Sequence, residues 1–89
     1  MSHITQRQAS ASEKEQSQGW ELWESGETDS FEYTYDQDVQ FVVQSGKAVI
    51  HSTTHEPVAI SAGNHVTIRK GVEAKWAISE PIVNRYQYL

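Results

Sequence analysis

Short runs of aromatic and β-branched residues with a period of two fill the chain from Gly19 onward, and this pattern constrains the fold most. Polar turn-forming clusters interrupt the runs at roughly 8–12-residue intervals, a spacing typical of an all-β sandwich or barrel. In the segment SFEYTYD, for example, the side chains of Phe31, Tyr33 and Tyr35 lie on one face, opposite Glu32 and Thr34. We therefore predict an all-β domain and find no convincing helix in the pattern.

The turns divide this part of the chain into about eight short strands, and eight antiparallel strands with few free edges suggest a jelly roll. Gly46 is predicted to end one strand, and the segments THEP, AGN and KGVE supply further turns. The two prolines, Pro57 and Pro81, are predicted to stand where strands begin, because a proline there removes no hydrogen-bond donor from the sheet.

The first eighteen residues differ in composition from the rest of the chain. They are rich in Ser and Gln, and their only apolar side chains are Met1, Ile4, Ala9 and Ala11. These bury too little surface to offset the entropy lost on ordering. We predict a flexible arm over residues 1–18 and a barrel domain over 19–89. As an alternative, Ile4 could form a short edge strand on a neighbouring subunit.

Composition excludes several classes of function. Seven Lys and Arg against twelve Asp and Glu give a net charge of -5, and the basic residues are scattered, so we expect no nucleic-acid partner. The chain has no cysteine, which excludes disulfides, a zinc ribbon and a thiolate nucleophile and favours the cytoplasm. No apolar run has the length of a signal peptide or a membrane span, so we expect no membrane partner.

Two glycine-anchored segments carry a resemblance to a known family. They are YTYDQDVQFVVQSG at 33–46 and GNHVTIRKGVEAKW at 63–76. With the preceding W-x-x-W and the terminal Tyr86, they resemble the cupin superfamily. Their order looks like that of its small single-domain branch, which includes cupin domains related to ureidoglycine aminohydrolase and to an ethanolamine-utilisation protein. The resemblance covers about Gly19 to Leu89 and implies a cupin-type double-stranded β-helix, a jelly-roll barrel of about eight or more antiparallel strands.

The metal ligands that this resemblance implies are missing. Metal-bearing cupins carry two histidines and a glutamate in the first segment and a histidine in the second. The residues at the matching positions are Tyr33, Tyr35, Val39 and Ala74. Valine and alanine have no lone pair to donate, and a phenol, which titrates at about 10, is a poor ligand at neutral pH. We predict a metal-free barrel without a cofactor.

Other ionisable residues are interpreted as non-catalytic. Three histidines could replace the missing ligands: His51, His55 and His65. His65 alternates with Val66 and Ile68, which take the interior, so it is expected to face outward or against a second sheet. We interpret all three as separate surface histidines. Asp36 and Asp38 are interpreted as turn residues rather than a carboxylate pair, and no catalytic residue is predicted.

The same pattern predicts an aromatic and apolar lining for the barrel. The expected lining residues are Tyr33, Tyr35, Val39, Phe41, Ala74, Trp76 and Ile78. Two phenol hydroxyls and the indole N–H would orient a ligand in such a pocket, and Arg69 or Arg85 could hold an anionic group at its mouth. The pattern fits equally a barrel interior filled by its own side chains, so both interpretations stay open.

Three functions are consistent with these features. The first is a metal-free binding or accessory module for a small molecule. The second is an enzyme of the aminohydrolase or isomerase kind, with Tyr33 or Tyr35 as proton donor. The third is a structural dimerisation module, whose interface would use the aromatic residues Trp20, Trp23, Tyr86 and Tyr88. We expect a homodimer, since a domain of 89 residues hides only about 60–65% of its unfolded surface.

Overall fold

The computed structural model describes residues 4–53 and 56–89. Within these residues the chain forms seven strands and one short helix. In chain order they are β1 (Ile4–Gln8), α1 (Ala11–Ser17), β2 (Glu21–Glu24), β3 (Ser30–Thr34), β4 (Val39–Ser52), β5 (Val58–Ser61), β6 (Asn64–Ile68) and β7 (Glu73–Tyr88). Every strand pair is antiparallel. The predicted all-β jelly-roll class is confirmed.

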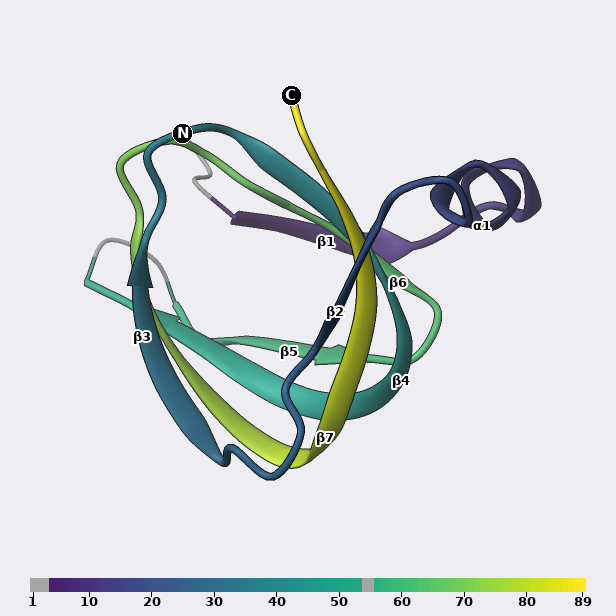
Figure 1. Cartoon of the computed structure of the whole chain (residues 1–89). Coiled ribbons are helices and arrows are strands. Elements are labelled where there is room, and N and C mark those ends of the chain that lie inside the picture. Colours follow the sequence, from purple (N-terminus) through teal and green to yellow (C-terminus); the bar gives the residue numbers. More distant parts are fainter. Residues whose placement is uncertain (1–3, 54–55) are drawn as a thin grey trace.

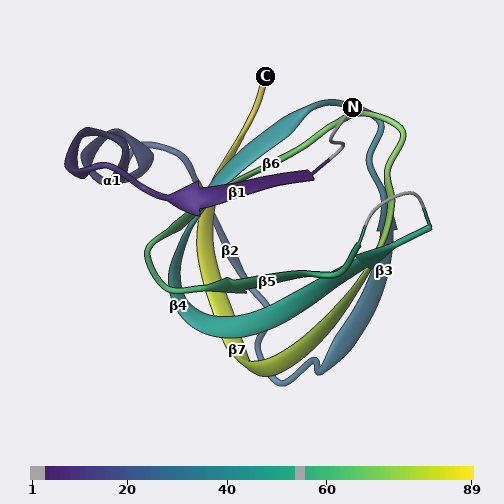
Figure 2. The ribbon, with the colours of Figure 1, turned by 180° about the vertical axis from the view of Figure 1, so that it is seen from behind.

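Two long bent strands, β4 and β7, build both walls of the barrel (Figure 1). The first half of β4 pairs with the second half of β7, and this wall has the order β1-β6-β4-β7-β2. The second half of β4 pairs with the first half of β7, with β5 and β3 as the outer strands of the other wall. The view from behind shows β1 running beside β6 along the open edge of the first wall (Figure 2).

Gly46 and Pro81 lie where these two long strands bend. The pairing of β4 with β7 shifts register three times between Val43 and Ala48, which marks bulges on both strands. A Cβ on Gly46, whose φ is 95°, would lie 2.0 Å from the Pro81 carbonyl oxygen. The predictions that Gly46 ends a strand and that Pro81 begins one are therefore wrong, because both residues lie inside continuous strands. Each of β4 and β7 therefore contains two of the predicted strands, and β1 is a strand that the sequence pattern did not predict.

The helix α1 contradicts the expectation that no helix forms. It begins with a capping box in which the Ser10 side chain accepts from the Glu13 backbone N–H and the Glu13 carboxylate accepts from the Ser10 N–H. The Arg7 side chain pairs with the same carboxylate, and these bonds lower the pKa of Glu13 to about 2. The S-x-x-E spacing was present in the sequence and is a recognised start signal.

A strand and a helix thus occupy the segment for which the composition predicts a mobile arm. Strand β1 forms on the β6 edge of its own chain, where Ile4 pairs with Ile68, rather than on a neighbouring subunit. The Ile4 side chain is only 3% exposed and belongs to the core. One well-placed apolar side chain and a helix cap give this segment contacts that its average composition conceals.

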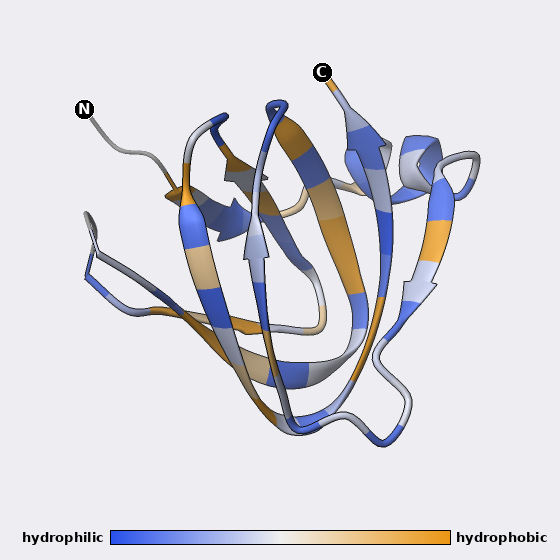
Figure 3. Ribbon diagram, turned by 60° about the vertical axis from the view of Figure 1, so that its left-hand side comes forward, coloured by the Kyte–Doolittle hydropathy of each residue, from blue (hydrophilic) through white to orange (hydrophobic). Residues whose placement is uncertain are grey.

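Hydrophobic and hydrophilic residues alternate along parts of the strands (Figure 3). The buried core consists of Ile4, Val39, Phe41, Val43, Ala48, Ile50, Ile60, Val66, Ile68, Val72, Ala74, Trp76 and Ile82. The predicted inward direction of Val66 and Ile68 is confirmed. No helix in residues 4–53 or 56–89 is long and apolar enough to cross a membrane.

Candidate ligand-binding pocket

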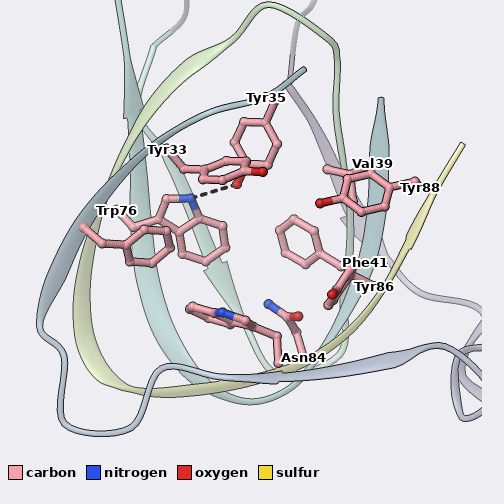
Figure 4. Close-up of a pocket in the computed structure, with 10 residues that line it drawn as sticks. Tyr33, Tyr35, Val39, Phe41, Trp76, Asn84, Tyr86 and Tyr88 are labelled. Carbon is pink, nitrogen blue, oxygen red and sulfur yellow. Dashed lines mark hydrogen bonds between the residues drawn. The ribbon is translucent and has the colours of Figure 1, made fainter. Parts of the chain in front are cut away.

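A cavity of about 180 Å³ lies inside the barrel, bordered by residues of β2, β3, the start of β4 and both halves of β7 (Figure 4). The alternation of these strands turns every second side chain toward it. Its lining consists of Trp23, Phe31, Tyr33, Tyr35, Val39, Phe41, Trp76, Asn84, Tyr86 and Tyr88. No lining residue carries a charge, so the interior is an aromatic surface with hydroxyl, indole and amide groups.

Ring contacts hold one wall of the cavity in place. Phe31 and Trp76 are cross-strand partners whose rings stack with centroids 5.2 Å apart and an interplanar angle of 23°. Trp23 lies 5.3 Å from Phe31 and 5.9 Å from Trp76, and Phe41 lies 5.6 Å from Trp76, all between ring centroids. These separations are typical of favourable aromatic pairs. The wall is therefore preorganised.

Tyr35 is the polar group at the upper end of the view in Figure 4. The Trp76 Nε1–H donates to the Tyr35 hydroxyl oxygen at 3.3 Å. Burial raises the pKa of Tyr35 to about 12, against the smaller opposing effect of that hydrogen bond. The phenol therefore stays protonated at neutral pH and keeps its own O–H to donate. This shift moves its pKa away from the range that a proton donor at pH 7 needs.

Tyr33 and Tyr88 form the mouth of the cavity. Their side chains are 43% and 45% exposed, in contrast to the buried Phe41 and Trp76. A hydrogen bond with Tyr33 is the main cause that raises the pKa of Tyr88, and Tyr33 also packs edge-on against Tyr35 with ring centroids 4.8 Å apart. The entrance is thus bordered by phenol rings that solvent reaches.

Asn84 lies at the opposite end of the cavity from Tyr33 and Tyr35, and its amide points inward (Figure 4). The residue is only 4% exposed. Its neighbours across the sheet are Trp23 on β2 and Val43 on β4. In the described part of the chain, no hydrogen bond is formed by its side-chain amide.

The structure brings together most of the predicted lining but not all of it. Tyr33, Tyr35, Val39, Phe41 and Trp76 border the cavity. Ala74 is buried beside a second, wider depression of about 430 Å³ whose border is mostly polar, and Ile78 is half-buried against the core.

The two arginines proposed as an anion grip are engaged elsewhere. The Arg69 Nη1 donates to Asp38 Oδ2 at 3.3 Å, and the Arg85 Nη1 donates to the Trp20 carbonyl oxygen at 3.3 Å. Asp38 also accepts from the Lys70 backbone N–H at 2.7 Å, and this bond is the main cause that lowers its pKa. Asp38 therefore links its own turn to residues 69–70, a contact that the interpretation as a turn residue did not include.

The sequence interpretation missed part of the lining, which is Trp23, Phe31, Asn84, Tyr86 and Tyr88. Trp23 and Tyr86, expected in an outer interface, instead turn toward the cavity and are half-buried, while Tyr88 also lines the cavity but is 45% exposed. The dimer interface itself stays a prediction. The sequence did contain a pattern that predicts the inward direction of Asn84, Tyr86 and Tyr88. Ile82, Asn84, Tyr86 and Tyr88 alternate with Val83, Arg85 and Gln87, which places the aromatic rings on the same face as a buried isoleucine.

The residues at the family's metal positions do not fit a divalent cation. Val39 and Ala74 are aliphatic and 3% exposed, and Tyr35 is held as a neutral phenol. Across residues 4–53 and 56–89, no three His, Cys, Asp or Glu side chains come close enough to hold a metal ion. The side chains found here supply no ligand set of the kind that transition metals take in proteins.

The interpretation of three surface histidines is wrong for His65. It faces outward from β6 as expected, but α1 covers it, and it is 6% exposed. Its Nε2 lies 3.1 Å from Gln40 Oε1 and 3.8 Å from Glu13 Oε2, and burial is the main cause that lowers its pKa. His51 is exposed, and His55 lies outside the described residues.

Comparisons with known proteins agree with this architecture. Residues 12–86 match the family model of the EutQ-like cupin domain. A DUF861 family protein from Thermotoga maritima is 22% identical, with a TM-score of 0.88 over 97% of this chain and 99% of that chain. A protein assigned as ethanolamine utilization protein Q from Salmonella typhimurium is 17% identical, with a TM-score of 0.62 over 98% of this chain and 58% of that chain. At these identities both structures show the fold alone. None of the curated proteins matches the chain.

Proposed function

This chain belongs to the EutQ-like cupin domain family, and from that premise we propose that it is a small-molecule binding or accessory module that works without a metal. The observation that carries the proposal is the aromatic cavity of about 180 Å³ inside the barrel. Small-molecule sites in proteins are commonly concave and apolar, with a few polar groups that orient the ligand.

The preorganised wall supports ligand binding over a merely filled interior. Trp23, Phe31 and Trp76 are fixed by mutual ring contacts, while solvent reaches the cavity past Tyr33 and Tyr88. A ligand that enters would meet rings already held in position, so little side-chain entropy would be lost on binding.

Indole N–H resonances test this proposal directly, because each tryptophan gives one signal in a ¹H–¹⁵N NMR spectrum. We expect toluene, a seven-atom aromatic probe, to shift the signals of Trp23 and Trp76, which line the cavity, and to leave that of Trp20, which does not. Trp→Phe variants at the three positions assign the signals. Equal shifts for all three tryptophans, or no shift at saturating toluene, would refute a pocket inside the barrel.

The metal-free part of the proposal has its own test. The support for it is the set of residues at the metal positions, Tyr33, Tyr35, Val39 and Ala74. We expect isothermal titration with nickel, zinc and manganese to give no stoichiometric binding. A one-to-one isotherm that is lost in Tyr35→Phe would overturn this part alone.

The cytoplasmic location and the homodimer expected from the sequence belong to the same proposal. Light scattering on the eluting peak of a size-exclusion column measures the mass in solution. A particle of 10.1 kDa, the mass of one chain, would exclude the homodimer.

A further inference from the structure

The amide of Asn84 points into the deep end of the cavity and has no hydrogen-bond partner among the described residues. It is 4% exposed, and the cavity that it enters is lined by rings from β2, β3, β4 and β7. Its nitrogen and oxygen open onto the cavity and are not sealed inside the core, since no fully buried side-chain nitrogen or oxygen of the described residues lacks a partner. They are therefore available to a ligand that carries both an acceptor and a donor.

The volume of the cavity limits the size of that ligand. An engineered apolar cavity of about 150 Å³ in another protein binds benzene, and the cavity here is about 180 Å³. One six-membered ring with a small substituent fills such a space. Nucleotides and disaccharides are too large to enter it.

The lining also limits the charge of the ligand. An anion would be buried without a counter-charge, since the Arg85 side chain lies on the opposite face of β7 from Asn84 and donates to the Trp20 carbonyl. A simple aromatic cation would find ring faces, but it would bring no acceptor for the Asn84 amide N–H groups or the Tyr35 hydroxyl. The lining therefore favours a neutral molecule.

We propose that the cavity takes a neutral six-membered heteroaromatic ring with a lactam edge, paired with the Asn84 amide. A lactam presents a carbonyl oxygen beside an N–H, and these match the N–H and the carbonyl of an asparagine amide in two parallel hydrogen bonds. Asparagine pairs in the same two-bonded way with the edge of adenine in DNA. The ring itself packs against the wall of Phe31 and Trp76. This inference rests on the proposed function and names the class of ligand.

The test compares small probes on the full-length wild-type protein by NMR titration. The probe is 2-pyridone, the simplest aromatic lactam, and its control is N-methyl-2-pyridone, which keeps the ring and the carbonyl but lacks the N–H. We expect 2-pyridone to bind at least about tenfold more tightly, since the loss of one well-formed hydrogen bond corresponds to roughly this factor. Benzoate, the anionic control, is expected to bind more weakly than 2-pyridone.

The matched variant is Asn84→Leu, which replaces the amide by an apolar group of similar volume. It is expected to weaken 2-pyridone about tenfold or more and to leave toluene unchanged or tighter, with a thermal unfolding scan confirming that it folds. The wild-type probe series tests the inference even if the variant does not fold.

Toluene binding separates a failure of the lactam inference from a failure of the proposed function. If toluene shifts Trp23 and Trp76 but N-methyl-2-pyridone or benzoate binds as tightly as 2-pyridone, the lactam inference is overturned and the pocket stands. If neither toluene nor 2-pyridone binds, the proposed function fails as well.

Discussion

At the scale of single residues, burial decides what the polar groups of the cavity can do. Tyr35 stands at a position where metal-bearing relatives carry a histidine, and burial among rings keeps its phenol neutral. Asn84 is buried to a similar depth as the core valines, yet it is polar. The sequence indicated Tyr35 as a lining residue through its alternation with Thr34. The alternation from Ile82 also places Asn84 on the core face, but the sequence interpretation passed over it, because a polar residue in an alternating strand is ordinarily assigned to the solvent face.

The raised pKa of Tyr35 predicts a loss of stability in alkaline solution. The phenol has a pKa of about 10 in the unfolded chain and about 12 in the folded one. The stabilisation that this difference gives the folded state is therefore complete below pH 10 and is lost as the pH rises to 12. A shift of two units corresponds to on the order of 2–3 kcal/mol. Urea unfolding at pH 8 and pH 11.5 should therefore show wild type losing more stability than Tyr35→Phe. Parallel losses in the two proteins would show that Tyr35 does not carry the shift.

At the scale of elements, the bend of β4 and β7 lets two strands serve two walls. The bend forms where Gly46 approaches the Pro81 carbonyl, and the pairing of the two strands shifts register through the bulges there. Glycine and proline are ordinarily signals that a strand ends. Only the packing of one strand on the other keeps these two strands continuous, so the sequence interpretation divided each into two.

Replacing Gly46 by alanine is expected to destabilise the barrel strongly. Gly71 is the matched control, since its φ of 94° is close to the 95° of Gly46 but a Cβ there would meet no atom within 4 Å. Gly71→Ala should lower the free energy of unfolding by about 1–2 kcal/mol through the backbone conformation alone. Gly46→Ala should lower it by at least about 2 kcal/mol more, because its Cβ would overlap the Pro81 carbonyl. Urea unfolding measures both, and equal costs would contradict the close approach.

At the scale of the whole molecule, the N-terminal segment closes one edge of the barrel. Strand β1 pairs with β6 and brings Ile4 into contact with the common core, while α1 covers the buried His65 on the outer face. In a domain of this size each buried side chain is a large share of a thin stability margin. The segment is thus part of the folded body, with a core residue contributed from a strand that the composition did not predict.

Truncating Ile4 tests this role of the segment. Ile4→Ala is expected to lower the free energy of unfolding by about 2–5 kcal/mol, the range for a buried isoleucine. Thr5→Ala, at the exposed neighbouring position in the same strand, should change it by less than about 0.5 kcal/mol. Thermal or urea unfolding of both variants is the measurement. Similar small changes for the two would indicate that β1 is detached in solution.

Local sequence patterns were enough to establish the class of the fold and one face of most strands, because period-two alternation and turn residues act locally. The family resemblance implied that Tyr33, Tyr35, Val39 and Ala74 stand at metal-ligand positions, and the residue types alone indicate that these side chains are poor ligands. Three features appear only in the folded chain: β4 and β7 run through their bends, β1 pairs with β6, and the Asn84 amide meets aromatic rings from other strands in one cavity. These features depend on contacts between segments far apart in the chain, and no local pattern contains the free energy of such contacts.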